Sequence, residues 1–212
     1  MPLAEGVWLH RSFRHIEGFG LVDANGLVVR GDTGVLLVDT AWTPQQTKHL
    51  LEWVEAEMRL PVTDVVITHG HGDSSGGLSA LPASTRVHAL PETFAQIAAE
   101  GVRPANAVEV PPDQSVTLAG APVEILFPGH GHAPDNLVVY LPEQAILFGG
   151  CFIKAATSRG LGNVADADLT SWPRAVAKTR ERFPAARVVV PGHGEPGGPE
   201  LLTHTERLLE SR

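Results

Sequence analysis

Cysteine is almost absent from this sequence of 212 residues, in which it occurs once, at position 151. A single cysteine excludes an internal disulfide, although it leaves the compartment open because disulfide-free proteins also exist in oxidising spaces. The close-spaced cysteine pairs that are typical of purely structural zinc sites are missing as well. The chain is therefore neither a disulfide-rich scaffold nor a zinc module built on cysteine pairs.

Runs of basic or apolar residues are also lacking. The formal net charge is −8 and no cluster of lysine and arginine occurs, so we expect no nucleic-acid partner. No apolar stretch reaches the roughly 18 residues of a membrane-spanning helix, so we expect no membrane partner either. Residues 1–6 lack the charged and apolar regions of a signal peptide. The chain as given is thus expected to be a cytosolic protein or a mature form.

No linker, low-complexity tract or charge block interrupts the chain, which predicts a single domain over residues 1–212. Apolar, β-branched runs predict strands over residues 26–30, 35–39, 62–68, 123–127, 137–141, 145–148 and 187–190. Helices are expected over residues 44–58, 91–100 and 199–209, and from a cap at 168–170 to residue 183. Residues 65–71 and 188–194 each carry a strand into glycine and histidine. This weak likeness predicts two pseudo-symmetric halves with a site between them.

The strongest local pattern is His69-Gly70-His71-Gly72-Asp73, which directly follows a buried strand. Two imidazoles and a carboxylate alternate there with glycines, which let the backbone turn sharply. Zinc favours histidine nitrogen and aspartate oxygen, and such a trio on a loop can reach the geometry that zinc requires. The alternative is a polar surface loop that happens to hold two histidines. The spacing favours metal binding.

Three later residues extend this set. His132, Cys151 and His193 each follow an apolar run and lie beside glycine. Taken singly, a lone cysteine is more often a small buried hydrophobe, and a lone histidine is usually a loop residue with its hydrogen bonds satisfied. Together with the first motif they provide six ligands, enough for two neighbouring metal ions with a water between them. An open coordination position, and hence catalysis, is the better interpretation.

A competing motif overlaps the first one. Residues 72–76 read Gly-Asp-Ser-Ser-Gly and match Gly-x-Ser-x-Gly, the nucleophile elbow of α/β-hydrolases. With Asp135 or Asp166, and then His193, the chain order serine, aspartate, histidine would also fit. The elbow requires its serine at a sharp turn directly after a strand, whereas Ser74 comes after two histidines. A serine hydrolase with Ser74 as nucleophile is therefore the weaker interpretation.

The pattern of these residues resembles the subclass B1 metallo-β-lactamases. The likeness also covers residues 25–29, 38–42, 135–140, 149–151, 162–168 and 191–194, in order along nearly the whole chain. Related hydrolases, such as glyoxalase II-like thioesterases, usually have a histidine after the aspartate and a bridging aspartate later. This chain has Ser74 and Cys151 at those positions. The thiolate favours the lactamase interpretation, and a thioesterase-like hydrolase on the same scaffold remains the alternative.

The resemblance implies an α/β fold, a four-layer αβ/βα sandwich of two mixed β-sheets flanked by helices, with the site at one edge. It implies two Zn²⁺ ions per chain. We call their ligands the first set, which is His69, His71 and His132, and the second set, which is Asp73, Cys151 and His193. His130 is the other candidate in its cluster, but the register set by Asp135-Asn136 favours His132.

The implied activity is hydrolysis of the β-lactam amide bond of penicillins, cephalosporins and carbapenems by a zinc-bound hydroxide, which would confer antibiotic resistance. The partner is then a small-molecule β-lactam, and the family implies a periplasmic location. We expect a monomer. Asp73 would orient the hydroxide, and the Asn163 amide would help to stabilise the developing oxyanion.

Two further residues are implied to contact the substrate. Lys154 resembles the family's anchor for the substrate carboxylate, a contact that suits an ammonium group, against the alternative of an ordinary solvated lysine. Phe19 lies between glycines in residues 16–22, which resemble a mobile hairpin over the site. The phenylalanine would be an apolar lid, and the alternative is a tight turn with one exposed aromatic ring.

Overall fold

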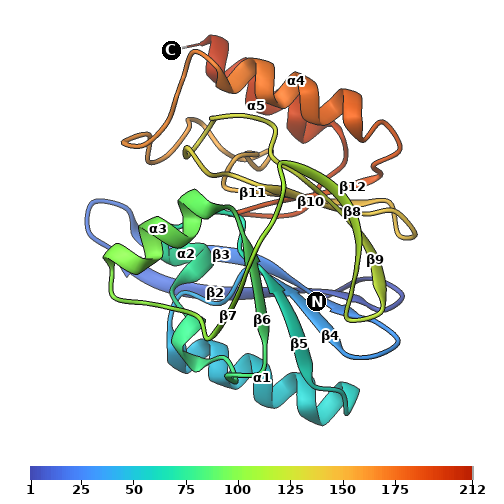
Figure 1. The fold of residues 1–212 in the computed structure, drawn as a ribbon. Helices are drawn as coiled ribbons and strands as arrows, with labels where there is room; N and C mark the ends of the chain where they lie inside the picture. The colour runs from blue at the N-terminus through green and yellow to red at the C-terminus, as the bar shows by residue number, and fades with distance from the viewer. Residues whose placement is uncertain (212) are drawn as a thin grey trace.

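The computed structural model describes residues 1–211, in which two mixed β-sheets pack face to face between helices (Figure 1). The N-terminal sheet has seven strands whose order in the sheet follows the chain. It starts with antiparallel strands and is parallel from β4 onward. Its strands are β1 (Pro2–Ala4), β2 (Val7–Ile16), β3 (Gly20–Arg30), β4 (Val35–Val38), β5 (Val62–Val66), β6 (Arg86–Ala89) and β7 (Asn106–Glu109).

The C-terminal sheet has five strands in the order β12-β11-β10-β9-β8. Its β11 and β12 run parallel to each other, whereas the other neighbours are antiparallel. The strands are β8 (Asp113–Leu118), β9 (Ala121–Leu126), β10 (Val138–Leu141), β11 (Ile146–Gly150) and β12 (Val188–Pro191).

Helices cover the outer faces of both sheets. Figure 1 shows α4 and α5 on the C-terminal sheet and α1 on the opposite side of the molecule, beneath the N-terminal sheet. The helices are α1 (Pro44–Met58), α2 (Gly72–Ser75), α3 (Pro91–Ala99), α4 (Trp172–Arg182) and α5 (Glu200–Glu210), with a short 3₁₀ turn at Leu78–Ala80. The layers therefore run helix, sheet, sheet, helix, which confirms the expected αβ/βα sandwich.

The core lies between the two sheets, where alternate residues of each strand point inward. Leu27 and Val38 of the first sheet and Val139, Phe148 and Val190 of the second belong to one cluster of fully or almost fully buried side chains. The residues on the other face of each sheet pack against the helices in two further apolar clusters. This packing on both faces holds the loops at the strand ends on a rigid frame.

The helices that the sequence predicts are present, with local differences at their ends. Thr43 caps α1, because its hydroxyl accepts the Gln46 N–H at 3.2 Å. The cap expected at residues 168–170 lies just before α4, where the Asp168 carboxylate accepts the N–H groups of Thr170 and Ser171. The glycine-rich residues 70–77 contain the single-turn helix α2.

Several strands were not predicted. The strands β1, β2, β6, β7 and β8 lie outside every expected range, and β3 begins at residue 20 rather than 26. The early start of β3 has a clear cause, since β2 pairs with it along its whole length, from Val7–Val29 to Ile16–Gly20. The pairing carries the hairpin formed by β2, residues 17–19 and β3 beyond the edge of the core.

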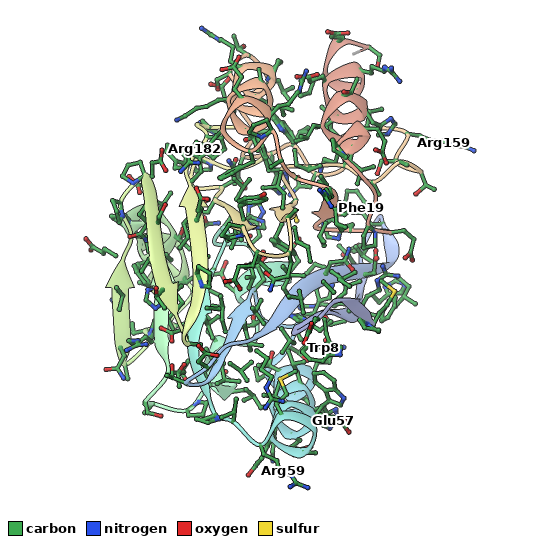
Figure 2. All side chains as sticks on the ribbon, turned by 90° about the vertical axis from the view of Figure 1, so that its right-hand side faces the viewer. Trp8, Phe19, Glu57, Arg59, Arg159 and Arg182 are labelled. Atoms are coloured by element: carbon green, nitrogen blue, oxygen red, sulfur yellow. The ribbon has the colours of Figure 1, made fainter. Side chains whose placement is uncertain are left out.

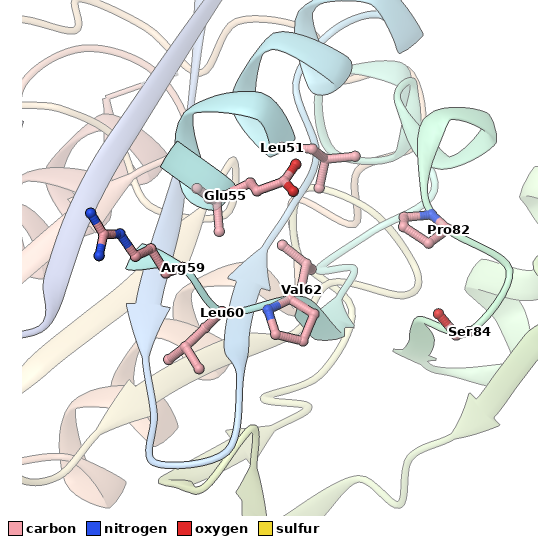
Figure 3. Close-up of a pocket in the computed structure, with 9 residues that line it drawn as sticks. Leu51, Glu55, Arg59, Leu60, Val62, Pro82 and Ser84 are labelled. Carbon is pink, nitrogen blue, oxygen red and sulfur yellow. The ribbon is translucent and has the colours of Figure 1, made fainter. Parts of the chain in front are cut away.

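Among the described residues, no helix has the length and apolar character needed to cross a membrane. A cavity of about 610 Å³ lies beside the end of α1 (Figure 3). Leu51, Leu60 and Val62 supply apolar walls there, and Glu55 and Arg59 supply its charged groups. Its lining has no histidine or cysteine, so it does not provide the ligands of a zinc site.

Candidate metal centre

The predicted ligands are delivered by strand ends from both sheets. His69 and His71 follow β5, Asp73 lies on α2, and Cys151 and His193 directly follow the parallel strands β11 and β12. His132 lies on the loop between β9 and β10 and completes the same cluster. Carboxyl ends of parallel strands open at one edge of a sheet, which makes them a common place for a ligand site. The two halves of the chain thus contribute to a single site.

The three histidines of the first set face one another. The ring centroids of His69 and His71 are 4.7 Å apart, and that of His132 lies 5.2 and 5.3 Å from them. His69 and His132 are buried, and His71 is partly exposed. His130, the other candidate in its cluster, turns aside and donates its Nε2–H to the Asp166 carbonyl at 2.8 Å.

The members of the second set are in direct contact. The Cys151 thiol donates to Asp73 Oδ2 at 3.0 Å, and its sulfur lies 3.2 Å from His193 Nε2. His193 Nε2 is itself 3.1 Å from Asp73 Oδ2. One nitrogen, one sulfur and one oxygen therefore converge on a common point.

Buried polar atoms without hydrogen-bond partners indicate that this cluster binds a cation. Within the described chain, His69 Nε2 and Asp73 Oδ1 are buried without a hydrogen-bond partner, and they face each other across 3.5 Å. Buried polar atoms are almost always paired, so such orphans call for a further ligand. Ligand atoms of His69, His71 and Asp73, of His69, His132 and Cys151, and of Asp73, Cys151 and His193 lie within 4.8 Å of one another. Nitrogen, thiolate and carboxylate donors are the ligands that zinc takes.

Hydrogen bonds behind the imidazoles fix which nitrogen faces the cluster. Ser74 Oγ donates its one proton to Asp39 Oδ2, so it accepts from His69 Nδ1 at 2.9 Å and leaves Nε2 facing the cluster. His71 donates Nε2–H to Asp166 Oδ2 at 2.9 Å, which leaves Nδ1 for the cluster. His193 donates Nδ1–H to the backbone carbonyl of Asp23.

Burial sets the protonation of two histidines of the first set, His69 and His132. It lowers the pKa of His69 to about 4, although the Asp73 charge opposes it. Burial also lowers the pKa of His132 well below its usual value, with the neighbouring His69 acting in the same direction. Both rings are therefore neutral near pH 7, the state in which imidazole binds a metal ion.

The pKa values of the second set shift for different reasons. Burial would raise the pKa of Asp73, but His69 and His193 outweigh it and lower that pKa well below its usual value. Bonds to Asp73 raise the pKa of His193 although burial opposes them. Burial and the Asp73 charge raise the pKa of the Cys151 thiol well above its usual value. A metal ion at this set must therefore displace protons.

A pocket of about 260 Å³ opens beside the cluster and brings the predicted substrate residues to it. Phe19, Lys154 and Asn163 all line this pocket together with Asp73 and His193. Figure 2 shows Phe19 at the end of the β2–β3 hairpin, where its side chain is 61% exposed. Lys154 is buried, with its Nζ 5.4 Å from the centre of the Trp172 ring.

Ser74 is placed unfavourably for a nucleophile. Its side chain is only 2% exposed, on α2 behind the cluster, and its hydroxyl is hydrogen-bonded to the buried residues Asp39, His69 and Thr68. The sequence missed Trp42, which lines the pocket, and the partner roles of Asp39 and Asp166. Asp166 lies within residues 162–168, so the resemblance contained a signal for it.

Comparison with known proteins agrees with this geometry. Residues 19–193 match the family model of the metallo-beta-lactamase superfamily. The chain therefore belongs to the metallo-beta-lactamase superfamily.

Within that superfamily the chain is similar to a "Metallo-beta-lactamase type 2" from Bacteroides fragilis. The two are 38% identical over 207 residues, which is 98% of this chain and 83% of the relative. This full-length similarity confirms the expected resemblance to the subclass B1 enzymes.

Solved structures show the same likeness. A metallo-beta-lactamase from Pontibacter korlensis superposes with a TM-score of 0.94 at 38% identity, and covers 100% of this chain and 98% of that one. FIM-1 from Pseudomonas aeruginosa, in its mono-zinc form, gives a TM-score of 0.90 at 39% identity over 99% of this chain and 93% of that one. The fold is thus shared along nearly the whole chain.

Proposed function

We propose that this chain is a zinc-dependent hydrolase that opens the amide bond of β-lactams. The observation that carries the proposal is the convergence of Asp73, Cys151 and His193 within 3.2 Å, beside a cluster of three histidines. The full-length similarity to type 2 metallo-beta-lactamases supports the same activity. Penicillins, cephalosporins and carbapenems are the substrates that we expect.

Two zinc ions are the cofactors in this proposal. The first set would hold one ion and the second set the other. The orphaned atoms His69 Nε2 and Asp73 Oδ1 support ligation at both sets. Bound zinc supplies a Lewis acid for the substrate carbonyl and lowers the pKa of water enough for nucleophilic attack near pH 7.

The residues around the cluster position the reactants. Asp73 holds its second oxygen toward the cluster and would orient the attacking water. Asn163 lies on the pocket wall, and its side-chain oxygen accepts the Ala165 N–H at 3.1 Å. Its amide N–H₂ would donate to the oxyanion that develops on the lactam carbonyl.

Lys154 and Phe19 would hold the rest of the substrate. The Lys154 ammonium is buried between the cluster and Trp172, so a substrate carboxylate entering the pocket would give it an ionic partner. Phe19 would cover the apolar face of a bound substrate from the hairpin. Such contacts improve the orientation of the amide bond at the nucleophile.

We further propose that the protein acts as a monomer in the periplasm, where it would confer resistance to β-lactam antibiotics. The family resemblance supports this location.

A substrate panel tests the proposal. The purified protein is assayed with a penicillin, a cephalosporin, a carbapenem and a glutathione thioester, each with added zinc and with EDTA. Ser74→Ala is assayed in parallel, to test for a serine nucleophile. We expect zinc-dependent turnover of the β-lactams and none of the thioester. Turnover of the thioester alone would move the function to a thioesterase, and EDTA-resistant activity that Ser74→Ala abolishes would support a serine hydrolase.

A further inference from the structure

The β2–β3 hairpin reaches the loop that carries His193, although more than 160 residues separate them in the chain. Three polar side chains make the contact, Arg11 on β2 and Asp23 and Asn25 on β3. We call them the hairpin clamp. Arg11 is the pairing partner of Asn25 across the hairpin, and Arg11 Nε donates to Asn25 Oδ1 at 2.9 Å. The three side chains therefore act from adjacent positions.

The hairpin clamp holds the peptide groups on both sides of Gly194. Asp23 Oδ2 accepts the Gly194 N–H at 2.8 Å. On the other side, the Gly194 carbonyl accepts from Arg11 Nη2 at 2.9 Å and from Asn25 Nδ2 at 2.7 Å. Each bond goes to backbone, so the clamp fixes the course of the chain directly after His193.

Gly194 needs this support because its conformation is unusual. Its φ is +82°, a region that residues with side chains rarely adopt, and a Cβ there would lie 2.7 Å from the Cβ of Ala155. Glycine solves the steric problem but gives the loop freedom to move. The clamp restricts that freedom from outside the loop.

His193 receives a second restraint from the same hairpin. Its Nδ1–H donates to the backbone carbonyl of Asp23, which leaves Nε2 facing Asp73 and Cys151. One residue, Asp23, thus orients the imidazole with its carbonyl and the following peptide with its carboxylate. Outer partners of this kind commonly tune the affinity of a metal-ligating histidine about 10–100-fold.

The charges in the clamp are only partly solvated. The side chains of Arg11 and Asp23 are 25% and 23% exposed, and Arg11 Nε lies 3.6 Å from Asp23 Oδ2. Arg11 also pairs with Glu195 at 2.6 Å, but Glu195 is 70% exposed. Exposed pairs contribute little, so we attribute the effect of the clamp to its bonds to Gly194 and not to Glu195.

We propose that Arg11 and Asp23 are positioning residues for the second metal set. They hold Gly194 and thereby keep His193 in place for metal binding, so that the affinity of this set depends on the hairpin. The inference rests on the proposed function only in requiring that Asp73, Cys151 and His193 bind zinc. It assigns the residues no contact with substrate.

Metal titrations of the apo protein test the proposal. Zinc affinities are measured against a chromophoric chelator for the wild type, Arg11→Ala and Asp23→Ala. Titration with Co²⁺ adds a site-specific signal, because Cys151 is the only cysteine and its thiolate absorption reports the second set alone. We expect both variants to lose about 10–100-fold in affinity at the second set, with affinity at the first set unchanged.

Matched variants separate the effect of losing the hydrogen bonds to Gly194 from the effect of losing a charge. Arg30→Ala removes a positive charge at the far end of β3, and Glu195→Gln removes only the exposed ion pair; both should bind metal like the wild type. Asp23→Asn retains an oxygen that can accept the Gly194 N–H, and Arg11→Lys retains the charge without the planar fork. These two should show intermediate losses, and they replace the alanine variants if those fail to fold.

The outcomes distinguish the two proposals. A wild type that binds no zinc at the second set would overturn the proposed function and the inference together. A wild type with both sets filled, and clamp variants with unchanged affinity, would overturn the inference alone. Equal losses at both sets would also overturn it, because they would indicate a general structural role.

Discussion

His69 and His193 both face Asp73, yet their pKa values shift in opposite directions. Burial dominates at His69 and lowers its pKa to about 4. At His193 burial also acts to lower the pKa, but the hydrogen bond and charge of Asp73 and the Asp23 carbonyl together outweigh it and raise the pKa. The Cys151 thiol beside His193 also holds its proton, because burial and the Asp73 charge raise its pKa. Protons therefore compete with metal more at His193 and Cys151 than at His69 and His132.

This difference predicts that acid removes zinc from the second set first. As the pH falls from 8 to 5.5, His193 becomes protonated and zinc must displace protons from both His193 and Cys151, so affinity there declines. His69 remains neutral over the same range because its pKa is about 4. Metal analysis after dialysis at fixed free zinc should show content falling from two equivalents to one. Loss of both ions together would contradict the assignment.

Phe19 provides a prediction for substrate binding. Phe19→Ala should raise KM for apolar β-lactams about tenfold, or about 1.4 kcal/mol, with a smaller effect on kcat, because burial of the ring against substrate is lost. Leu21→Ala is the matched control, since Leu21 lies on the same hairpin and is exposed. Steady-state kinetics over a panel of substrates measure both. Equal effects of the two variants on KM would contradict the proposed role of Phe19 as a lid over the substrate.

At the scale of single residues, the sequence indicated the metal ligands but not the residues that hold these ligands in place through hydrogen bonds. Histidine, aspartate and cysteine beside glycines at strand ends are recognisable without a structure. Asp39 and Asp23 are not, because the groups that they contact, Ser74 and Gly194, are far away in the sequence. Only the fold brings such partners together.

At the scale of elements, one buried carboxylate joins three parts of the fold. Asp64 on β5 is fully buried and accepts hydrogen bonds from Arg86 and His88 on β6, each at 2.8 Å. It also accepts the backbone N–H of Ala119, in the turn between β8 and β9 of the other sheet. Although burial acts to raise the pKa of Asp64, these bonds lower it below its usual value.

Asp64→Asn should therefore destabilise the protein by about 3 kcal/mol at pH 7, because one charge of a buried network is lost. A depressed pKa stabilises the fold above about pH 4, and this contribution is lost as the pH falls further. The difference between wild type and variant in urea unfolding should thus shrink at pH 3. Asp113→Asn, which removes an exposed partner of Arg182, should change stability by less than about 0.5 kcal/mol. A difference that does not depend on pH would contradict this account.

For several strands, but not for the largely buried β6, predictability followed burial. Strands buried on both faces, such as β4 and β11, appear as apolar runs and were predicted. The strands β7 and β8 lie at the edges of their sheets with mostly exposed or half-exposed residues, so no apolar run marks them. Their position is fixed by pairing with a neighbour, which a local pattern does not reveal.

At the scale of the whole molecule, the sandwich places one site across both halves of the chain. Because the core between the sheets draws on both halves, we predict that residues 1–212 unfold as a single domain. Zinc would contact ligands from both halves and should raise the melting temperature by linkage, by an amount that grows with the logarithm of the free zinc concentration above Kd. Calorimetry of the apo and zinc-loaded protein tests both points. Two separate transitions in the apo protein would contradict the single-domain prediction.

The overall arrangement was predictable from the order of motifs along the chain rather than from any one of them. The resemblance implied two mixed sheets and a site at their edge, and the structure has both. The contact between the hairpin and the His193 loop was not predictable, because it depends on how the two halves meet.

The central claim is that β-lactam turnover depends on zinc held by both metal sets. The most direct test is a zinc titration of the chelated protein, in which binding and the initial rate of carbapenem hydrolysis are recorded on the same samples. We predict no turnover without metal, full recovery on adding zinc, and saturation of binding at two equivalents per chain. Turnover that persists in EDTA, or two bound zinc ions without any hydrolysis, would contradict the claim.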